Sequence, residues 1–238
     1  MPDRNRIYHG VSIGILMLDT RFERFNGDIG NAGTWPFPVQ YRVVRDATPT
    51  RVTRPEGPDM LDAFKAAADE MIDAGVDGIT TTCGFLALYQ QELAAHCSVP
   101  VATSALLQVP MVTRMLPKGK RVGILTFSAE SLSIHHLAAV GIDPQTKVVG
   151  MPPTSEFQRS IREGDASVPF RVLRDEVLGV ARRMIADDPS IGAIVCECTN
   201  ITPYSHDLVR DLGVPVFDMV TLVRWFHRAL RPQHFRQD

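Results

Sequence analysis

The sequence predicts an α/β fold of two pseudo-symmetric lobes, each a parallel four-stranded sheet flanked by helices. Three observations support this prediction. Short apolar segments rich in β-branched residues alternate with helical patterns, these segments are continuous rather than alternating, and the second half of the chain repeats features of the first. Continuous apolar segments are typical of strands buried on both faces. Strands that alternate with helices form parallel sheets covered by helices on both sides.

The apolar segments give the predicted strands, and the helical patterns between them give the predicted helices. The strands are residues 11–18, 39–44, 78–82, 100–104, 121–127, 147–151, 193–197 and 215–219. The helices are residues 59–75, 86–97, 168–187 and 220–230. The first helix has Leu61, Phe64, Ala68 and Met71 on one face, and Gly75 is its expected end.

An internal duplication relates the two halves of the chain. Three pairs of positions share a spacing of 115 residues: Ile79 with Ile194, Cys83 with Cys198, and Pro100 with Pro215. The repeat predicts a first lobe at 1–110 and a second at 111–219, with 220–238 holding a C-terminal helix that packs back on the first lobe. Ligands of open parallel sheets bind beyond the carboxyl ends of the strands. We therefore expect the active site in the cleft between the lobes.

Residues 19–38 interrupt the pattern of strands and helices. Their Gly and Pro content argues against a regular element, and a loop this long in a compact domain is often a lid. Its residues Arg21, Arg24, Trp35 and Phe37 are candidates to cover the cleft, and an arginine there suits a carboxylate. The alternative is a loop that packs on the surface without touching the substrate.

Composition narrows the class of protein. The 238 residues are 45% hydrophobic and 22% charged, with a net charge of -2, so no basic surface predicts nucleic acid or an anionic membrane as partner. No apolar segment reaches the roughly 18 to 20 residues of a membrane helix, and the N-terminus lacks the apolar core of a secretory signal. We expect a cytoplasmic protein that forms a homo-oligomer.

The duplication distinguishes two of the four cysteines, which are too few for a disulfide framework. Cys83 and Cys198 are paired by the repeat and stand at predicted strand ends before helical segments, where N–H groups favour a thiolate. Two thiols on opposite faces of one carbon can remove a proton on one side and return one on the other. Cys97 and Cys196 have no repeat partner and are expected to be core residues.

These residues resemble a known family. The cysteines of TTCGF and ECTN, the duplicated halves and the chain length are similar to the aspartate/glutamate/hydantoin racemase superfamily, whose relatives include maleate cis-trans isomerases and arylmalonate decarboxylases. The resemblance implies that Cys83 and Cys198 are the catalytic pair. The predicted substrate-binding residues are Asp19, Thr82, Gly84, Thr126, Phe127, Ser128, Thr199 and Asn200. Gly84 and Phe85 stand where glutamate racemases have Asn-Thr, so glutamate is not the expected substrate.

The function that follows is a cofactor-independent racemase or epimerase of a small carboxylate such as an amino acid or hydantoin. One alternative is a maleate-type cis-trans isomerase that forms a cysteine adduct, and another is a two-lobed binding module without chemistry. No metal site is expected, since Cys196 and Cys198 lack a second ligand pair. Glu197 is expected to point away from the site, because adjacent side chains of a strand face opposite sides.

Overall fold

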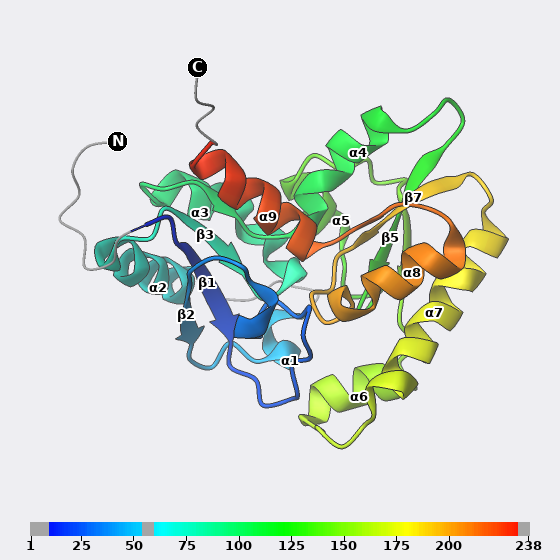
Figure 1. The fold of residues 1–238 in the computed structure, drawn as a ribbon, viewed down its shortest axis with the longest axis horizontal. Coiled ribbons are helices and arrows are strands. Elements are labelled where there is room, and N and C mark those ends of the chain that lie inside the picture. The colour runs from blue at the N-terminus through cyan, green and yellow to red at the C-terminus, as the bar shows by residue number, and fades with distance from the viewer. Residues whose placement is uncertain (1–9, 54–59, 233–238) are drawn as a thin grey trace, which may run out of the picture.

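The computed structural model describes residues 10–53 and 60–232. Two parallel four-stranded sheets flanked by helices form the two lobes of the molecule (Figure 1). The predicted fold class is confirmed. The ends of the chain at 1–9 and 233–238, and residues 54–59, lie outside the described residues. Residue 59, the first of the predicted helix 59–75, therefore also lies outside them.

The two sheets have the same strand order. The first sheet runs β2-β1-β3-β4 and the second β6-β5-β7-β8, and every pairing is parallel. The first contains β1 (Ile13–Leu18), β2 (Val39–Val44), β3 (Gly78–Thr81) and β4 (Val101–Ala102). The second contains β5 (Arg121–Thr126), β6 (Lys147–Gly150), β7 (Ile191–Cys196) and β8 (Val216–Phe217). The repeat in the sequence is therefore a repeat in topology.

Strand register and helix packing follow the same repeat. Gly14 of β1 pairs with Ile79 of β3, and Gly123 of β5 pairs with Ile194 of β7. Each glycine lies under a methionine of the helix that covers its sheet, α2 (Leu61–Ala74) or α7 (Phe170–Asp187). A Cβ would lie 3.0 Å from Met71 Sδ at the first position and 2.0 Å from Met184 Cε at the second. Both helices can approach their sheet closely because these strands carry glycine there.

The predicted helices are present, with one correction. α2 ends at Gly75, which adopts the left-handed conformation with φ 100° that only glycine takes without strain. Residues 86–97, expected to form one helix, instead contain the end of a 3₁₀ helix, η2 (Gly84–Tyr89), followed by α3 (Gln90–His96). The tighter 3₁₀ turn begins directly after Cys83, where the chain leaves β3 and reverses.

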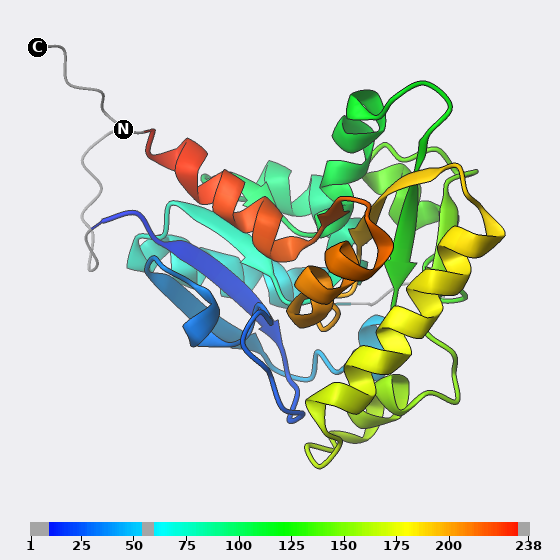
Figure 2. The same cartoon turned by 45° about the vertical axis from the view of Figure 1, so that its right-hand side comes forward.

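The remaining helices connect and cover these strands. They are η1 (Ala32–Thr34), α1 (Pro49–Val52), η3 (Ala105–Gln108), α4 (Val109–Met115), α5 (Ile134–Ala139), α6 (Glu156–Glu163), η4 (Thr202–Tyr204), α8 (Ser205–Leu212) and α9 (Met219–Leu230). Figures 1 and 2 place α7 along the outside of the second lobe and α9 beside the first.

One hydrophobic core joins the lobes. Ile13 and Ile15 of β1 belong to the same buried cluster as Ile124 of β5 and Ile194 of β7. α9 follows the last strand of the second lobe but contacts β3 of the first, where the Phe226 ring covers Gly78 so closely that a Cβ would lie 2.7 Å from its Cζ. Burial of apolar side chains across both sheets fixes how the strand ends of the two lobes face each other.

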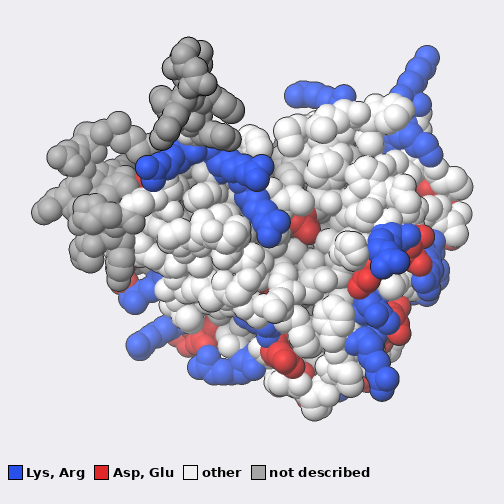
Figure 3. Space-filling model, viewed as in Figure 1, with Lys and Arg blue, Asp and Glu red and all other residues white. Residues whose placement is uncertain are grey.

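Charged side chains gather along one edge of the molecule. Along the right-hand edge in Figure 3, over α6, α7 and α8, basic and acidic groups alternate. Ion pairs there join Arg159 to Glu163 and Arg182 to Asp211. Within the described ranges, no helix combines the length and the apolar character needed to cross a bilayer.

Candidate active site

Cys83 and Cys198 face one pocket between the two sheets. β3 ends at Thr81 and β7 at Cys196, and each paired cysteine follows two residues later. Because the carboxyl ends of both sheets point into the space between the lobes, both thiols line the same pocket. We group the residues of its wall by their chemistry into a polar part and an apolar part. The polar part contains Thr20, Arg24, Thr53, Thr82, Cys83, Gly84, Glu197, Cys198, Thr199 and Asn200, and the apolar part contains Leu18, Phe22, Pro49, Val52, Phe85, Phe127 and Ile161.

Hydrogen bonds hold the two cysteine loops together. The Thr199 hydroxyl donates to the Thr82 carbonyl oxygen at 2.7 Å, which joins the residue after one cysteine to the residue before the other. The Thr82 hydroxyl in turn accepts from the Leu18 backbone N–H at the end of β1. Both bonds are buried, so the protein itself satisfies these Thr82 and Thr199 groups.

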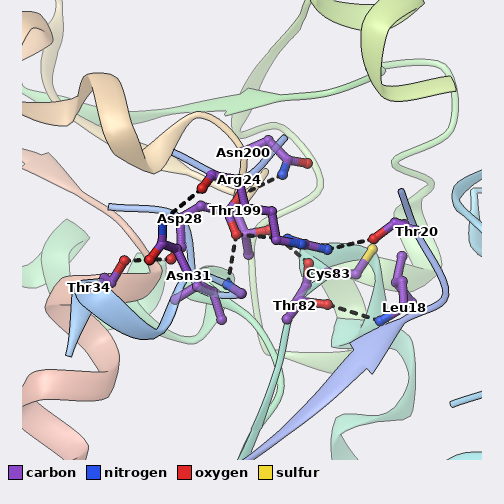
Figure 4. Close-up of polar contacts among 12 residues, drawn as sticks. Leu18, Thr20, Arg24, Asp28, Asn31, Thr34, Thr82, Cys83, Thr199 and Asn200 are labelled. Carbon is purple, nitrogen blue, oxygen red and sulfur yellow. Dashed lines mark hydrogen bonds and ion pairs between the residues drawn. The ribbon is translucent and has the colours of Figure 1, made fainter. Parts of the chain in front are cut away.

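The loop at 19–38 places a buried charge cluster beside the pocket, with Arg24 in the pocket wall. Arg24 donates to Asp28 at 2.7 Å and to the Thr20 hydroxyl at 2.8 Å, and Asn200 donates to the other Asp28 oxygen at 2.7 Å. Figure 4 shows the Arg24 side chain extending past Cys83 toward Thr20. Asn200 also contacts the thiol of Cys198, whose Sγ lies 3.8 Å from Asn200 Oδ1. The Arg24 and Asp28 side chains are only 12% and 3% exposed.

The other three loop residues predicted to cover the cleft do not line the pocket. Arg21 is exposed and forms an ion pair with Asp19 at 3.3 Å. Trp35 packs on Phe37, and the Phe37 ring stacks on His227 of α9 at 3.8 Å between ring centroids. These contacts fasten the loop to the first lobe, so among the four loop candidates Arg24 alone lines the pocket.

Five of the eight predicted substrate-binding residues line the pocket, and three do not. Thr82, Gly84, Phe127, Thr199 and Asn200 lie in its wall, whereas Asp19, Thr126 and Ser128 do not. Asp19 turns to Arg21 at the surface. Thr126 is fully buried beneath the wall and donates to Glu197, and the Ser128 hydroxyl accepts the Ser131 N–H in a turn. That these three residues bind the substrate stays a prediction, and the structure places them outside the pocket wall.

Burial controls the acidity of both thiols. It raises the pKa of Cys83 to about 12, with a further increase from the Glu197 carboxylate, while the N–H groups of Phe85 and Leu86 and the charge of Arg24 oppose it. Burial and Glu197 also raise the pKa of Cys198 well above its ordinary value. The expectation that N–H groups at a helix start would make these thiols acidic is wrong for the empty pocket, because desolvation outweighs those groups.

Glu197 is the pocket residue that sequence reasoning assigned to the wrong side. β7 ends at Cys196, so the alternation of strand side chains no longer applies to Glu197. The residue is fully buried in the pocket wall, and the Thr126 hydroxyl donates to its Oε2 at 2.6 Å. Burial raises the pKa of Glu197 to about 7, opposed by this hydroxyl and by the Phe127 N–H. The sequence ECTN shows a carboxyl directly before Cys198. Because β7 ends one residue before Glu197, this side chain points into the pocket.

The other two cysteines lie outside the pocket wall. Cys196 is fully buried in the core at the end of β7, and Cys97 is partly exposed after α3. Within residues 10–53 and 60–232, no three His, Cys, Asp or Glu side chains come together as a metal ion requires.

Solved structures with this fold define the class of protein. Allantoin racemase from Klebsiella pneumoniae matches 93% of this chain and 87% of its own with a TM-score of 0.67 at 17% identity. Arylmalonate decarboxylase matches 94% of both chains with a TM-score of 0.60 at 15% identity. Glutamate racemase from Campylobacter jejuni matches 94% of this chain and 88% of its own with a TM-score of 0.55 at 13% identity. The chain has the fold of the aspartate/glutamate/hydantoin racemase superfamily, as the sequence predicted.

Sequence relatives narrow this class to a family. A dimethylsulfoniopropionate lyase of Durusdinium sp. clade D is 28% identical over 96% of this chain and 78% of its own length. Dimethylsulfoniopropionate lyase 7 of Emiliania huxleyi is 31% identical over 92% of this chain and 67% of its own length. The chain belongs to the dimethylsulfoniopropionate lyase family. No protein-family model matches it.

These relatives correct the predicted activity. They are lyases, whereas the sequence led us to expect a racemase or epimerase, with a maleate-type isomerase or a binding module as alternatives. The protein is an enzyme, but the prediction of an isomerase is wrong. A shared fold does not fix the reaction, because the reaction depends on the groups in the site and on the substrate it admits.

Proposed function

We propose that the protein is a carbon–sulfur lyase acting on dimethylsulfoniopropionate or a closely related β-sulfonio carboxylate. The observation that carries this proposal is the pair of thiols facing one pocket in a chain that belongs to the dimethylsulfoniopropionate lyase family. Such a substrate has a carboxylate at one end, a dialkylsulfonium at the other, and an acidic proton on the carbon between the carboxylate and the β-carbon.

The reaction is an elimination that needs one base. A thiolate removes the proton from the α-carbon, and the electrons of that C–H bond form the new double bond to the β-carbon. The β-carbon–sulfur bond breaks, and its electron pair leaves with the sulfur as neutral dimethyl sulfide, so acrylate remains. The thiol has gained the proton, which must pass to solvent before the next turnover. The leaving sulfide needs no proton, so no acid is required on that side.

Cys83 is the better placed of the two thiols to be this base. The N–H groups of Phe85 and Leu86 and the charge of Arg24 all favour its thiolate. For Cys198, the Asn200 N–H favours the thiolate, while the nearby Asp28 carboxylate disfavours ionisation of the thiol. We assign Cys198 to hydrogen bonding with the substrate carboxylate, on which negative charge accumulates as the α-proton leaves.

The two parts of the pocket match the two ends of the substrate. Arg24 supplies a positive charge, and Thr199 and Asn200 supply polar groups for a carboxylate. The dimethylsulfonium end is a cation with an apolar surface, which aromatic rings accommodate well. The rings of Phe22, Phe85 and Phe127 line the apolar part. The proposed reaction requires that the α-carbon, which lies between these two ends, be beside the thiols.

Release of dimethyl sulfide tests the proposal. The purified protein is incubated with dimethylsulfoniopropionate, and headspace gas chromatography measures dimethyl sulfide beside Cys83→Ser and Cys97→Ser. The proposal expects release by the wild type and by Cys97→Ser, whose thiol lies outside the pocket wall. It expects a loss of about 10²- to 10⁴-fold in Cys83→Ser, the range of a general base. A folded wild-type protein that releases no dimethyl sulfide at any substrate concentration would overturn it.

A further inference from the structure

One buried acid in the pocket has no role in the reaction as described so far. The Glu197 side chain is fully buried, and its Oε1 has no hydrogen-bond partner among the residues that the structure describes. Its Oε2 accepts a hydrogen bond from the Thr126 hydroxyl, and the Phe127 N–H also favours the anion. These two donors do not offset the burial of the carboxylate, which therefore takes up a proton more readily than an exposed one.

Glu197 lies close to the loop that carries Cys83. A Cβ added at Gly84 would lie only 2.2 Å from both the Glu197 Oε1 and its backbone oxygen, so the carboxyl is packed against the residue directly after Cys83. The absence of a side chain at Gly84 makes this approach of the two loops possible. The carboxyl of one lobe therefore lies against the cysteine loop of the other.

The duplication is broken at this carboxyl. Glu197 precedes Cys198 as Thr82 precedes Cys83, and the paired strands have matching register. In the first lobe the Thr82 hydroxyl accepts the Leu18 N–H and carries no charge. Among the described residues, Glu197 is thus the one acidic side chain of the pocket wall, where a symmetric pair of lobes would have two or none.

We propose that Glu197 and the Cys83 thiol share one negative charge, and that Glu197 holds the thiol proton while Cys83 acts as the base. This inference rests on the proposed lyase function. The exchange is balanced: the thiol and carboxylate become a thiolate and a carboxylic acid, the thiolate takes the α-proton of the substrate, and the carboxylic acid releases its own proton to solvent. Glu197 acts through Cys83 without touching the substrate, which makes it a positioning residue.

The neighbouring charges are consistent with this exchange. Cys83, Cys198 and Cys196 are the titratable groups whose pKa the Glu197 charge raises. Arg24 faces Cys83 and favours its thiolate, whereas Asp28 faces Cys198 and opposes ionisation there. An ionised Glu197 beside a thiolate would place two negative charges in the same buried space. One shared charge avoids that repulsion.

The pH profile of Glu197→Gln tests the proposal. The wild type should gain activity as the shared pair loses its first proton near pH 7 and then stay flat between about pH 8 and 9. In Glu197→Gln the thiol titrates alone, so kcat/KM should rise about tenfold per pH unit over that interval. Glu92→Gln, at an exposed position of α3, is the matched control and should keep the wild-type profile. A Glu197→Gln profile that stays flat over this interval would overturn the proposal.

Two further measurements keep the test independent of folding defects and of lyase activity. Thr126→Val removes the hydroxyl that stabilises the Glu197 anion, so the acid limb should move to higher pH while the plateau remains. The rate of Cys83 alkylation by iodoacetamide, followed by mass spectrometry without substrate, should show the same profiles. If the wild type releases no dimethyl sulfide but the alkylation profiles change as expected, the shared charge is supported and only the lyase function fails. An alkylation profile unchanged by both variants would overturn the shared charge.

Discussion

Glu197 occupies in the second lobe the position that Thr82 occupies in the first, directly before the paired cysteine of each lobe. The two residues differ in charge and partner: Thr82 accepts the Leu18 N–H, whereas Glu197 is held by the Thr126 hydroxyl. The pocket is therefore symmetric in its thiols and asymmetric in its carboxyl. An elimination has one base and one direction of proton removal, which an asymmetric site suits.

The two thiols are expected to contribute unequally. Cys83→Ser removes the proposed base and should lower kcat/KM by about 10²- to 10⁴-fold, whereas Cys198→Ser weakens one hydrogen bond and should cost about 10- to 100-fold. Steady-state rates of dimethyl sulfide release measure both. A loss in Cys198→Ser equal to or greater than that in Cys83→Ser would reverse the assignment of the base.

Arg24 is expected to act on substrate binding. Replacement by Ala removes the pocket cation and should raise KM by about 10- to 100-fold, the effect of losing a charge-assisted hydrogen bond of about 1.5 to 3 kcal/mol. Arg21→Ala is the matched control, since Arg21 is exposed and pairs with Asp19 outside the pocket wall. Equal KM values for the two variants would show that the carboxylate binds elsewhere.

Two glycines should respond differently to replacement by alanine. At Gly84 the new Cβ would lie 2.2 Å from the Glu197 backbone oxygen, which cannot move without shifting the loop. At Gly123 it would meet the Met184 Cε, the flexible end of a side chain. Gly84→Ala should therefore lower the free energy of unfolding by about 1 to 3 kcal/mol and Gly123→Ala by less. Urea denaturation measures both, and the opposite order would contradict the packing between the two cysteine loops.

Glu197 also gives a stability that depends on pH. Its folded-state pKa of about 7 lies above the ordinary value of 4.5, so the native state binds the proton more tightly than the unfolded state. The stability this provides is complete below about pH 4.5 and is lost as pH rises to about 7. The difference in the free energy of unfolding between Glu197→Gln and the wild type should therefore shift by about 3 kcal/mol in favour of the variant when the pH is raised from 4.5 to 8. Thermal unfolding at both pH values tests this, and a difference that does not change with pH would contradict it.

The fold could be predicted because two kinds of pattern agreed. Continuous apolar segments located the strands, and the constant spacing between Cys83 and Cys198 and their flanking Ile and Pro positions showed that the lobes are duplicates. The same spacing also distinguished these cysteines from Cys196, which the structure places in the core. Burial and periodicity are properties of neighbouring residues, so a single sequence contains them.

The details of the site were harder to predict from the sequence than the fold. The orientation of Glu197 depends on β7 ending at Cys196, and strand ends are poorly marked in sequence. The acidity of the thiols depends on how completely the lobes bury them, which is a property of the assembled pocket. Arg24 was one of four loop candidates, and only the fastening of Trp35 and Phe37 to the first lobe separates it from the others.

The reaction could not be predicted from the thiol pair. Removal of a proton next to a carboxylate begins a racemisation and an elimination alike. The two diverge only afterwards, when a proton returns or when a leaving group departs from the β-carbon. That leaving group belongs to the substrate, so two cysteines at matching strand ends fit either outcome.

Proton NMR of the purified enzyme with dimethylsulfoniopropionate in deuterated water tests the proposed reaction most directly. We expect the vinyl signals of acrylate and the methyl signal of dimethyl sulfide to grow together with wild-type enzyme and with Cys97→Ser, and to be absent with Cys83→Ser. Dimethylsulfoniopropionate that stays intact with folded wild-type enzyme, or products that form equally well with Cys83→Ser, would contradict the assignment of this pocket to thiol-dependent elimination.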